Sequence, residues 1–281
     1  MMRGMFAAIS GLKQHQVMLD VTANDISNVN TLGYKSSRVT FQDSLTQMQR
    51  GAAGPQGNNG GSNAAQVGLG VGLGSVDNLM TGGAVQTTGN PLDVAIQGDG
   101  FFQIGEGTPN PTLTNNPITP TAYTRAGNFS INAQGFLTTQ TGQYVLGFET
   151  PAGTAETAIR VPAGATGVAI DASGGVSYID PGTQTRETPY RLTLATFSNA
   201  AGLEREGGNR WMISANSGQK TVNTPGQAGL GVTTAGAVEM SNVDLSQTFT
   251  SMITAQRGFQ ANSRVISTAD EMLQDLVNLK R

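Results

Sequence analysis

Few residue patterns in this chain are suited to chemistry. The run from Gly68 to Gly74 alternates glycine with apolar residues as some phosphate-binding loops do, but neither a clear following helix nor a P-loop lysine accompanies it. Asp93 and Asp99 bracket a predicted strand and could pair for acid–base work, yet Asp99 lies in the common turn sequence Gly-Asp-Gly. His15 is the single histidine, and no acid or nucleophile stands near it. We therefore expect no catalytic residue, no cofactor and no enzyme activity.

The composition excludes several other kinds of site. The 281 residues contain no Cys, which excludes disulfides, thiolate catalysis and sulfur-ligated zinc, and a single His leaves no multi-histidine metal cage. Charged residues make up 12% of the chain and the net charge is -3, which argues against a basic surface for nucleic acid. No segment approaches the roughly 18 consecutive apolar residues of a membrane span, and no cleavable signal peptide is visible. We expect no metal, no nucleic-acid partner and no membrane insertion.

The positional pattern predicts a long N-terminal helix. Apolar residues recur from Met2 onward with spacings of three and four, as in the core row of a coiled coil. Gly33 and an asparagine-rich run mark the end of this pattern. The residues of the row that we expect to form an assembly interface are Met5, Ile9, Leu12, Leu19 and Ile26.

A second long helix is predicted at the C-terminal end. The sequence from Ser241 to Asp244 is typical of a capping box, and apolar residues then recur at a seven-residue period. A partner row is polar in its middle, at Gln256, Ser263 and Asp270. The expected interface residues are Leu245, Met252, Phe259, Ile266 and Leu273, with Phe249 and Val277 at the ends of the partner row.

The length of the second helix favours packing between molecules. Amphipathic terminal helices usually pack on their own domain. A helix of roughly 35 to 40 residues, however, is about 55 Å long, which exceeds the diameter of a β domain of about 150 residues. Much of its apolar row must therefore be covered by the other helix or by other copies of the chain.

The region between the helices lacks helical periodicity. Residues 51–74 are rich in Gly and Asn and nearly uncharged, which is typical of a linker or an irregular arm. From about Val85, short apolar runs alternate with turns such as 132–135 and 171–175. These patterns predict an α+β fold with one mainly antiparallel β domain at 86–224. The terminal helices at 1–30 and 241–281 would form a coiled-coil-like inner domain, joined to it by an extended arm at 31–85 and 225–240.

Several ordered motifs resemble those of a known family. Leu19 to Lys35 is similar to the N-terminal signature of bacterial flagellar rod and hook proteins, although Asp25 and Ser27 stand where that family often has Asn and Ala. Nearly the whole chain takes part in the resemblance. Its further motifs are 98–102, 123–129, 239–245, 255–260 and 276–281.

Within this family the chain most resembles the short hook proteins. The resemblance implies a hollow helical homopolymer that transmits motor torque to the filament while bending, as a universal joint. It also implies as partners other copies of the chain, the distal rod, the hook cap, the hook–filament junction proteins and the flagellar export apparatus. The protein would then be extracellular, in the hook and basal body, and exported without a cleaved signal peptide. A distal rod subunit is the near alternative, and a secreted β-rich adhesin or glycan-acting protein is the distant one.

The residues supply a mechanism for such a polymer. A heterologous interface whose rotation does not close generates a helical tube, and the apolar rows of both terminal helices can supply it. Before assembly these rows lack partners, so we expect the termini to be largely disordered in the free subunit. Polar contacts between β domains would allow sliding, and therefore bending.

Overall fold

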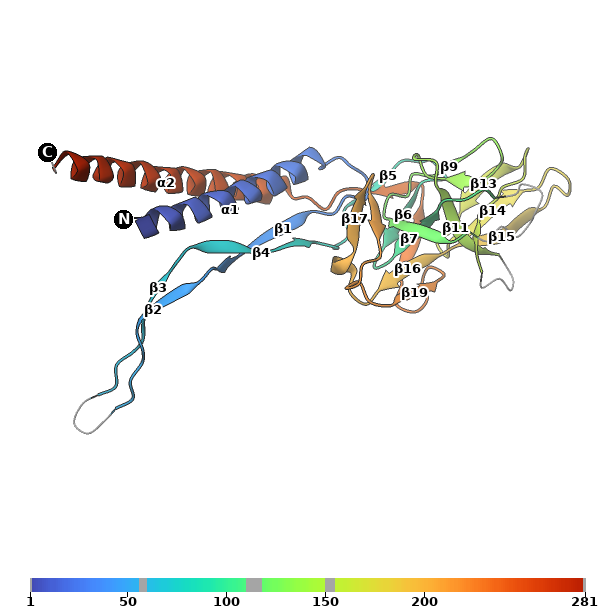
Figure 1. The fold of residues 1–281 in the computed structure, drawn as a ribbon. Coiled ribbons are helices and arrows are strands. Elements are labelled where there is room, and N and C mark those ends of the chain that lie inside the picture. Colours follow the sequence, from blue (N-terminus) through green and yellow to red (C-terminus); the bar gives the residue numbers. More distant parts are fainter. Residues whose placement is uncertain (1, 56–59, 110–117, 150–154, 280–281) are drawn as a thin grey trace. The chain divides into compact units, whose positions relative to one another are not determined.

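The computed structural model describes residues 2–55, 60–109, 118–149 and 155–279 (Figure 1). The chain forms two compact units. Unit 1 comprises Met1–Ser27, Ser37–Asp77 and Asp244–Arg281, and unit 2 comprises Asn28–Ser36 and Asn78–Val243. The fold is α+β, as predicted, with one long helix near each end of the chain and a large antiparallel β domain between them. Parts of two quoted patterns, residues 56–59 of the arm and 280–281 of the C-terminal motif, lie outside the described residues.

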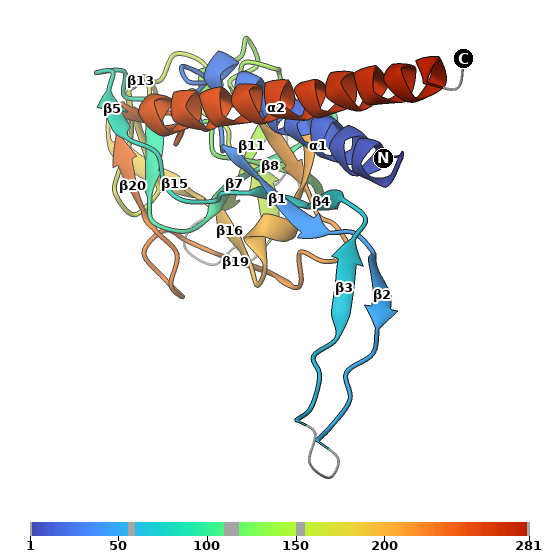
Figure 2. The same cartoon turned by 90° about the vertical axis from the view of Figure 1, so that its left-hand side faces the viewer.

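Unit 1 contains both helices. Helix α1 (Met2–Ser27) and helix α2 (Leu245–Asn278) pack side by side in opposite directions (Figures 1 and 2). The capping box was predicted to open the second helix at Ser241, but α2 begins at Leu245. Asp244 is its N-cap, and the side chain of Asp244 accepts hydrogen bonds from the N–H groups of Ser246 and Gln247. The packing of these two helices as a coiled coil remains a prediction.

A long β ribbon completes unit 1. Strand β1 (Ser37–Asp43) pairs with β4 (Val71–Asn78), and β2 (Thr46–Arg50) pairs with β3 (Ala65–Gly68). The β2–β3 part projects away from the helix pair in both views (Figures 1 and 2). The expectation of an irregular arm at 51–74 was therefore wrong for β3 and β4. Their residues show no alternation of buried and exposed positions, and without it a strand leaves no period-two signal in the sequence.

Unit 2 holds a 13-stranded sheet among the described residues, with the central order β13-β14-β15-β11-β7-β8-β18-β17. Every strand pairing recorded in it is antiparallel, which agrees with short strands joined by turns. The strands of the central order are β7 (Phe101–Gly105), β8 (Pro120–Thr124), β11 (Tyr144–Glu149), β13 (Thr166–Ile170), β14 (Gly175–Ile179), β15 (Arg186–Leu192), β17 (Glu204–Gly207) and β18 (Arg210–Met212).

Shorter strands extend this sheet or form separate pairs beside it. The pairs β5–β21 and β6–β20 join the first strands of unit 2 to its last ones. The remaining elements are β5 (Val85–Thr87), β6 (Val94–Gln97), β9 (Ser130–Ile131), β10 (Leu137–Thr138), β12 (Glu156–Ala158), β16 (Leu194–Phe197), the 3-10 helix Ala200–Gly202, β19 (Lys220–Asn223), β20 (Val232–Ala235) and β21 (Ala237–Glu239).

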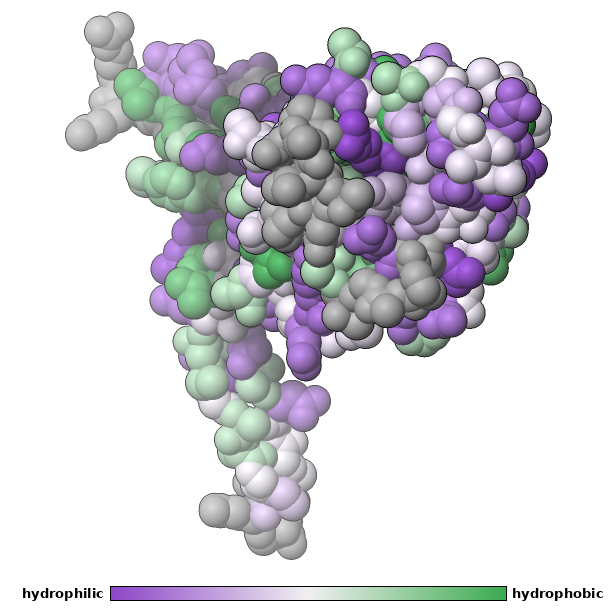
Figure 3. All heavy atoms as spheres, turned by 90° about the vertical axis from the view of Figure 1, so that its right-hand side faces the viewer, coloured by the Kyte–Doolittle hydropathy of each residue, from purple (hydrophilic) through white to green (hydrophobic). Residues whose placement is uncertain are grey.

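The hydrophobic core lies within unit 2. Strand β7 is an unbroken buried run, so its successive side chains enter different clusters: Phe102 packs edge to face on Phe129, with ring centroids 5.1 Å apart, while Phe101 joins a second cluster with Trp211. Trp211 is 3% exposed and anchors this second cluster. Figure 3 shows one face of this unit, on which hydrophilic and near-neutral residues predominate.

Candidate assembly surface

The buried positions of α1 are small or polar: Ala8, Gly11, Thr22 and Asp25, whose spacing fits a 3.5-residue period. Gly11 among them faces Asn262 of α2. Asp25 is satisfied locally, because its carboxylate accepts from the N–H of Ser37 at 3.2 and 3.3 Å. The predicted row lies beside this face and is half-buried; its members are Met5, Ile9, Leu12, Leu19 and Ile26.

The corresponding face of α2 also centres on small side chains. Ala255 and Ala269 are buried, and Asn262, midway between them at a seven-residue spacing, is half-buried. The predicted row begins three residues earlier and is half-buried at Met252, Phe259, Ile266 and Leu273. The row expected to be its partner points elsewhere: Phe249, Gln256, Ser263, Asp270 and Val277 are exposed, as is Leu245. The structure therefore places Ala255, Asn262 and Ala269 where the sequence analysis expected this other row.

Two glycines allow the helices to approach closely. A Cβ added at Gly11 would lie 2.7 Å from the Nδ2 atom of Asn262, and one added at Gly258 would lie 2.5 Å from the imidazole of His15. The same imidazole packs edge to face on Phe41 of β1, with ring centroids 5.8 Å apart. His15 thus fills the space between elements of unit 1, which agrees with an interface histidine rather than a catalytic base.

Large apolar side chains of unit 1 remain exposed as a consequence. Sixteen of the 22 exposed large apolar residues among those described belong to unit 1. Its buried apolar residues, by contrast, are three alanines out of the 34 described. The exposed set on the helices is Met2, Phe6, Leu245, Phe249, Ile253, Val265, Met272, Val277 and Leu279.

The ribbon of unit 1 carries the rest of this exposed apolar surface. All five residues of β2 are exposed, and a two-stranded ribbon of this kind is marginally stable by itself in water. Its exposed large residues are Phe41, Leu45, Met48, Val67, Leu69, Leu73 and Val76. Together with the helix residues, they form the surface of the chain that most requires a covering partner.

Sequence reasoning expected an interface formed by the helix rows, and it named neither the ribbon residues nor the buried small residues. A row of Ala and Gly at helical spacing is a readable signal, because small residues permit close helix approach. The ribbon has no comparable signal, since its strands show no alternation of buried and exposed residues.

The sequences that could have suggested chemistry have structural roles. The glycine run 68–74 lies in the ribbon, where the N–H of Val71 donates to the hydroxyl of Ser10 at 3.2 Å. The carboxylate of Asp93 accepts from Thr88 Oγ1 at 2.6 Å and from Asn90 Nδ2 at 3.1 Å, within a turn. Among the described residues, no group of three or more His, Cys, Asp or Glu is placed to hold a metal ion.

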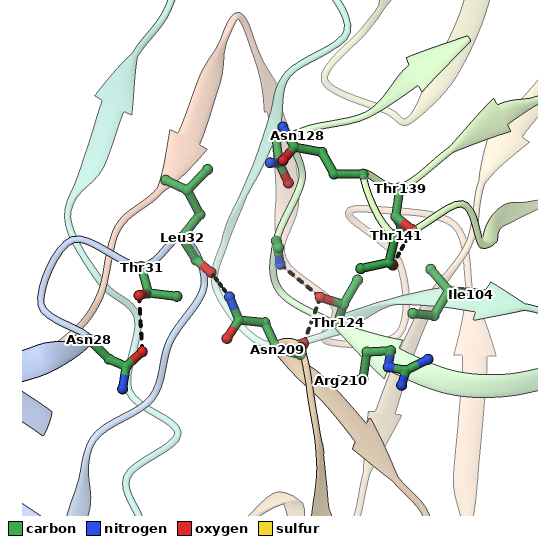
Figure 4. A pocket seen from close by; sticks show the side chains of 13 residues that line it. Asn28, Thr31, Leu32, Ile104, Thr124, Asn128, Thr139, Thr141, Asn209 and Arg210 are labelled. Carbon is green, nitrogen blue, oxygen red and sulfur yellow. Dashed lines mark hydrogen bonds between the residues drawn. The ribbon is translucent and has the colours of Figure 1, made fainter. Parts of the chain in front are cut away.

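Unit 2 contains a polar pocket of about 500 Å³ (Figure 4). Its amides and hydroxyls largely satisfy one another: Asn209 Nδ2 donates to the carbonyl of Leu32 at 2.8 Å, and Thr124 Oγ1 donates to the carbonyl of Asn209 at 2.9 Å. Arg210 reaches carboxylates on both sides, Glu206 at 3.5 Å and Glu106 at 3.6 Å. The pocket has no nucleophile paired with a base, and its cation is already compensated.

Neither described helix of the chain is long and apolar enough to cross a membrane. The exposed apolar surface of unit 1 is divided among amphipathic helices and a ribbon, with polar residues between.

Three family models match successive parts of the chain. The model described as flagella basal body rod protein matches residues 5–35, that of the FlgE/F/G flagellar hook protein D1 domain matches 95–178, and that of the FlgEFG basal body rod protein C-terminal region matches 234–279. The first of these matches lies within α1 and the segment after it, and the last covers α2.

Relatives that align along the whole chain are also flagellar rod and hook proteins. The flagellar basal-body rod protein FlgG of Bacillus subtilis is 44% identical over 282 residues, with all of both chains covered. FlgG of Caulobacter vibrioides is 39% identical over 283 residues, covering 99% of this chain and all of the relative. The flagellar hook protein FlgE of Borreliella burgdorferi is 26% identical over an alignment of 441 residues that covers all of both chains.

Proposed function

We propose that this chain, which belongs to the family of bacterial flagellar rod and hook axial proteins, is a subunit of the distal rod. The family consists of structural components of the flagellum. The chain is accordingly a flagellar axial structural subunit, and the proposal concerns its place along the axis. The observation that carries the proposal is the end-to-end match to rod proteins named FlgG at 44% and 39% identity.

The hook interpretation of the sequence is less well supported than its rod alternative. The alignment with the hook protein spans 441 positions against the 281 residues of this chain, so that hook protein has long segments without a counterpart here. The rod relatives align over nearly the same length as this chain. For a rod subunit the expected property is stiffness, and the bending expected of a hook does not apply.

Unit 1 is the proposed polymerisation surface. Its helices and ribbon expose sixteen large apolar side chains, each of which contributes roughly 1.5–3 kcal/mol when it is fully buried. A heterologous contact between such surfaces on successive copies gives a helical tube when the rotation does not close. The residues proposed to take part include Phe249, Met252 and Phe259 on α2.

The position in the basal body implies specific neighbours. In this proposal the chain contacts other copies of itself along the rod and hook subunits at the distal end of the rod. It reaches that position through the flagellar export apparatus, without cleavage of a signal peptide.

Electron microscopy of polymers assembled from the purified chain tests this proposal. Straight, uniform tubes are expected for a distal rod subunit. Regularly curved tubes would assign the chain to the hook instead, and a chain that stays monomeric at every concentration would contradict self-assembly through unit 1. As an independent measurement, expression in a Bacillus subtilis strain lacking FlgG should restore swimming, and expression in a strain lacking the hook protein should not.

A further inference from the structure

The chain passes between the two units four times, after Ser27, Ser36, Asp77 and Val243. Within unit 2, three segments lead to these crossings: 28–36, 78–84 and 237–243. These three segments are the covalent connections through which force can pass between the two units.

A single carboxylate joins all three segments. Oε1 of Glu239 accepts from Nζ of Lys35 at 2.6 Å and from the N–H of Gly83 at 2.9 Å. The carbonyl of Glu239 accepts in addition from the N–H of Gly33 at 2.8 Å. The third segment is thus bonded to both of the others through one residue.

Asn242, three residues further along the third segment, repeats this arrangement. Its Oδ1 atom accepts from the N–H of Ser36 at 2.7 Å. Its Nδ2 atom donates to the carbonyls of Leu79 at 2.8 Å and Thr81 at 3.2 Å. Two side chains three residues apart therefore tie the same three segments together.

The ties are anchored to the β core. NH1 of Arg125 donates to Oε2 of Glu239 at 3.2 Å, and the guanidinium of Arg125 lies over the ring of Phe101, 5.1 Å from its centroid. Arg205 holds the first segment from another strand: its guanidinium lies over the rings of Tyr34 and Trp211 and donates to the carbonyl of Lys35.

The three charged side chains of the Glu239 cluster are almost completely withdrawn from water. Lys35, Glu239 and Arg125 are 0%, 1% and 2% exposed. Burial lowers the pKa of Lys35, and the nearby Arg125 lowers it further, while Glu239 opposes both. A buried ionic cluster contributes little net stability, because desolvation cancels much of the attraction. Its geometry is nonetheless tightly specified, since a displaced partner leaves a buried charge uncompensated.

We propose that Glu239 and Asn242 are positioning residues of a mechanical junction that locks the three connecting segments into one rigid connector. Backbone hydrogen bonds also join these segments, from the N–H of Leu79 to the carbonyl of Ser36 and from the N–H of Met240 to that of Ala84, both at 2.9 Å. Glu239 and Asn242 add the side-chain ties that fix the three segments against one another. With them, torque applied to one unit displaces the other directly. The locking follows from the contacts in unit 2, whereas the transmission of torque rests on the proposed rod function.

Amide hydrogen exchange of the full-length subunit tests the locking. In Asn242→Ala, exchange of the Ser36 amide should accelerate about two- to tenfold, and in Glu239→Gln that of the Gly83 amide should accelerate about ten- to a hundredfold. Core amides of β7 and β11 should keep their rates. The matched control is Glu156→Gln, which removes a less buried ion pair with Lys220 that joins none of the three segments. Unchanged exchange at Ser36 in folded Asn242→Ala would overturn the proposal, as would an equal acceleration throughout unit 2.

The bending and torsional stiffness of the assembled polymer tests the transmission. Asn242→Ala is preferred here because it removes no buried charge, and unit 2 is therefore expected to stay folded. Its polymers should be at least about twofold more compliant than polymers of Glu156→Gln. Equal stiffness despite accelerated Ser36 exchange would overturn the mechanical role, and so would loss of assembly by this variant alone, since that would place Asn242 in the subunit interface. Failure of the unaltered chain to polymerise would instead contradict the proposed function and leave the exchange result standing.

Discussion

The two units of this chain differ in how far they bury their own large apolar side chains. Unit 2 packs aromatic and branched side chains into its own core, and residues such as Phe102, Leu192 and Leu194 have no exposed surface. Unit 1 buries only Ala8, Ala255 and Ala269 among the described apolar residues, and it leaves its large side chains outside. Burial of an alanine provides little hydrophobic free energy, so helix pairing by itself stabilises unit 1 weakly. Unit 2 therefore buries its own apolar side chains, and we propose that those of unit 1 are covered by other copies.

Removal of α2 should have the largest effect on this contrast. A chain ending at Asp244 loses the whole of α2, and with it seven of the sixteen exposed large apolar residues of unit 1. Polymerisation should be abolished, as measured by sedimentation, while the thermal unfolding transition of unit 2 persists. Tubes assembled from the truncated chain would contradict the assignment of the polymerisation surface to unit 1.

Two Phe→Ala substitutions, one in each unit, should have different effects on the stability of the free subunit. Phe102→Ala empties a fully buried site and should lower the free energy of unfolding of unit 2 by about 3–5 kcal/mol in chemical denaturation. Phe249→Ala changes a residue that is 49% exposed, so it should alter the stability of the free subunit by less than about 0.5 kcal/mol.

In the polymer the order of these two effects should reverse. Phe249→Ala should weaken assembly by about 1.5–3 kcal/mol for each interface, seen as a higher critical concentration. A critical concentration equal to that of the unaltered chain would exclude Phe249 from the interface.

Substitution of Gly258, where the two helices are in close contact, should have an effect of intermediate size on the stability of unit 1. The methyl group of Gly258→Ala would meet the ring of His15, and overpacking of this kind costs about 1–3 kcal/mol, more than the gain in helix propensity of at most about 1 kcal/mol. Helix content measured by circular dichroism should fall on heating at a lower temperature. The double variant His15→Ala with Gly258→Ala should restore it, and a failure to do so would show that the ring is not the obstacle.

The smallest expected effect concerns a turn of unit 2. Burial by itself would raise the pKa of Asp171, but hydrogen bonds from Ser173 and Gly175 outweigh it and lower that pKa. The ionised carboxylate therefore adds stability above the unfolded pKa of about 3.9, and this contribution is lost as the pH falls through the lower folded value. Asp171→Ala should cost about 0.5–1 kcal/mol at pH 7, because the residue is exposed, and less at pH 2. An equal loss at both pH values would contradict this account.

The sequence analysis predicted the antiparallel β character of unit 2 and the existence of both helices, but only some of the individual strands. Runs such as Phe101–Ile104 and Gly175–Ile179 are strands, and the turn at 171–175 forms, because each depends on local patterns of burial and turn residues. The ribbon of unit 1 could not be predicted in this way, since none of its strands has a fully buried residue or an alternation of buried and exposed positions.

The buried ionic cluster around Glu239 could not be predicted from the sequence, for a different reason. Lys35, Arg125 and Glu239 stand in separate motifs, and the sequence analysis assigned none of them a role. Their contacts join positions up to 204 residues apart, which no local pattern encodes. The same reason explains why the buried row of α2 differs from the predicted partner row. Periodicity showed that the helix is amphipathic, but contacts with the other helix decide which of its residues are buried.

Amide hydrogen exchange compared between the free subunit and the assembled polymer tests the central contrast most directly. The account predicts that amides of α1, α2 and the ribbon exchange rapidly in the free subunit and slow by more than about a hundredfold on assembly, because their apolar surfaces then become buried. Core amides of β7, β11 and β15 should be protected to the same degree in both states. Equal and strong protection of α1 and α2 in the free subunit would contradict the claim that unit 1 is completed by other copies.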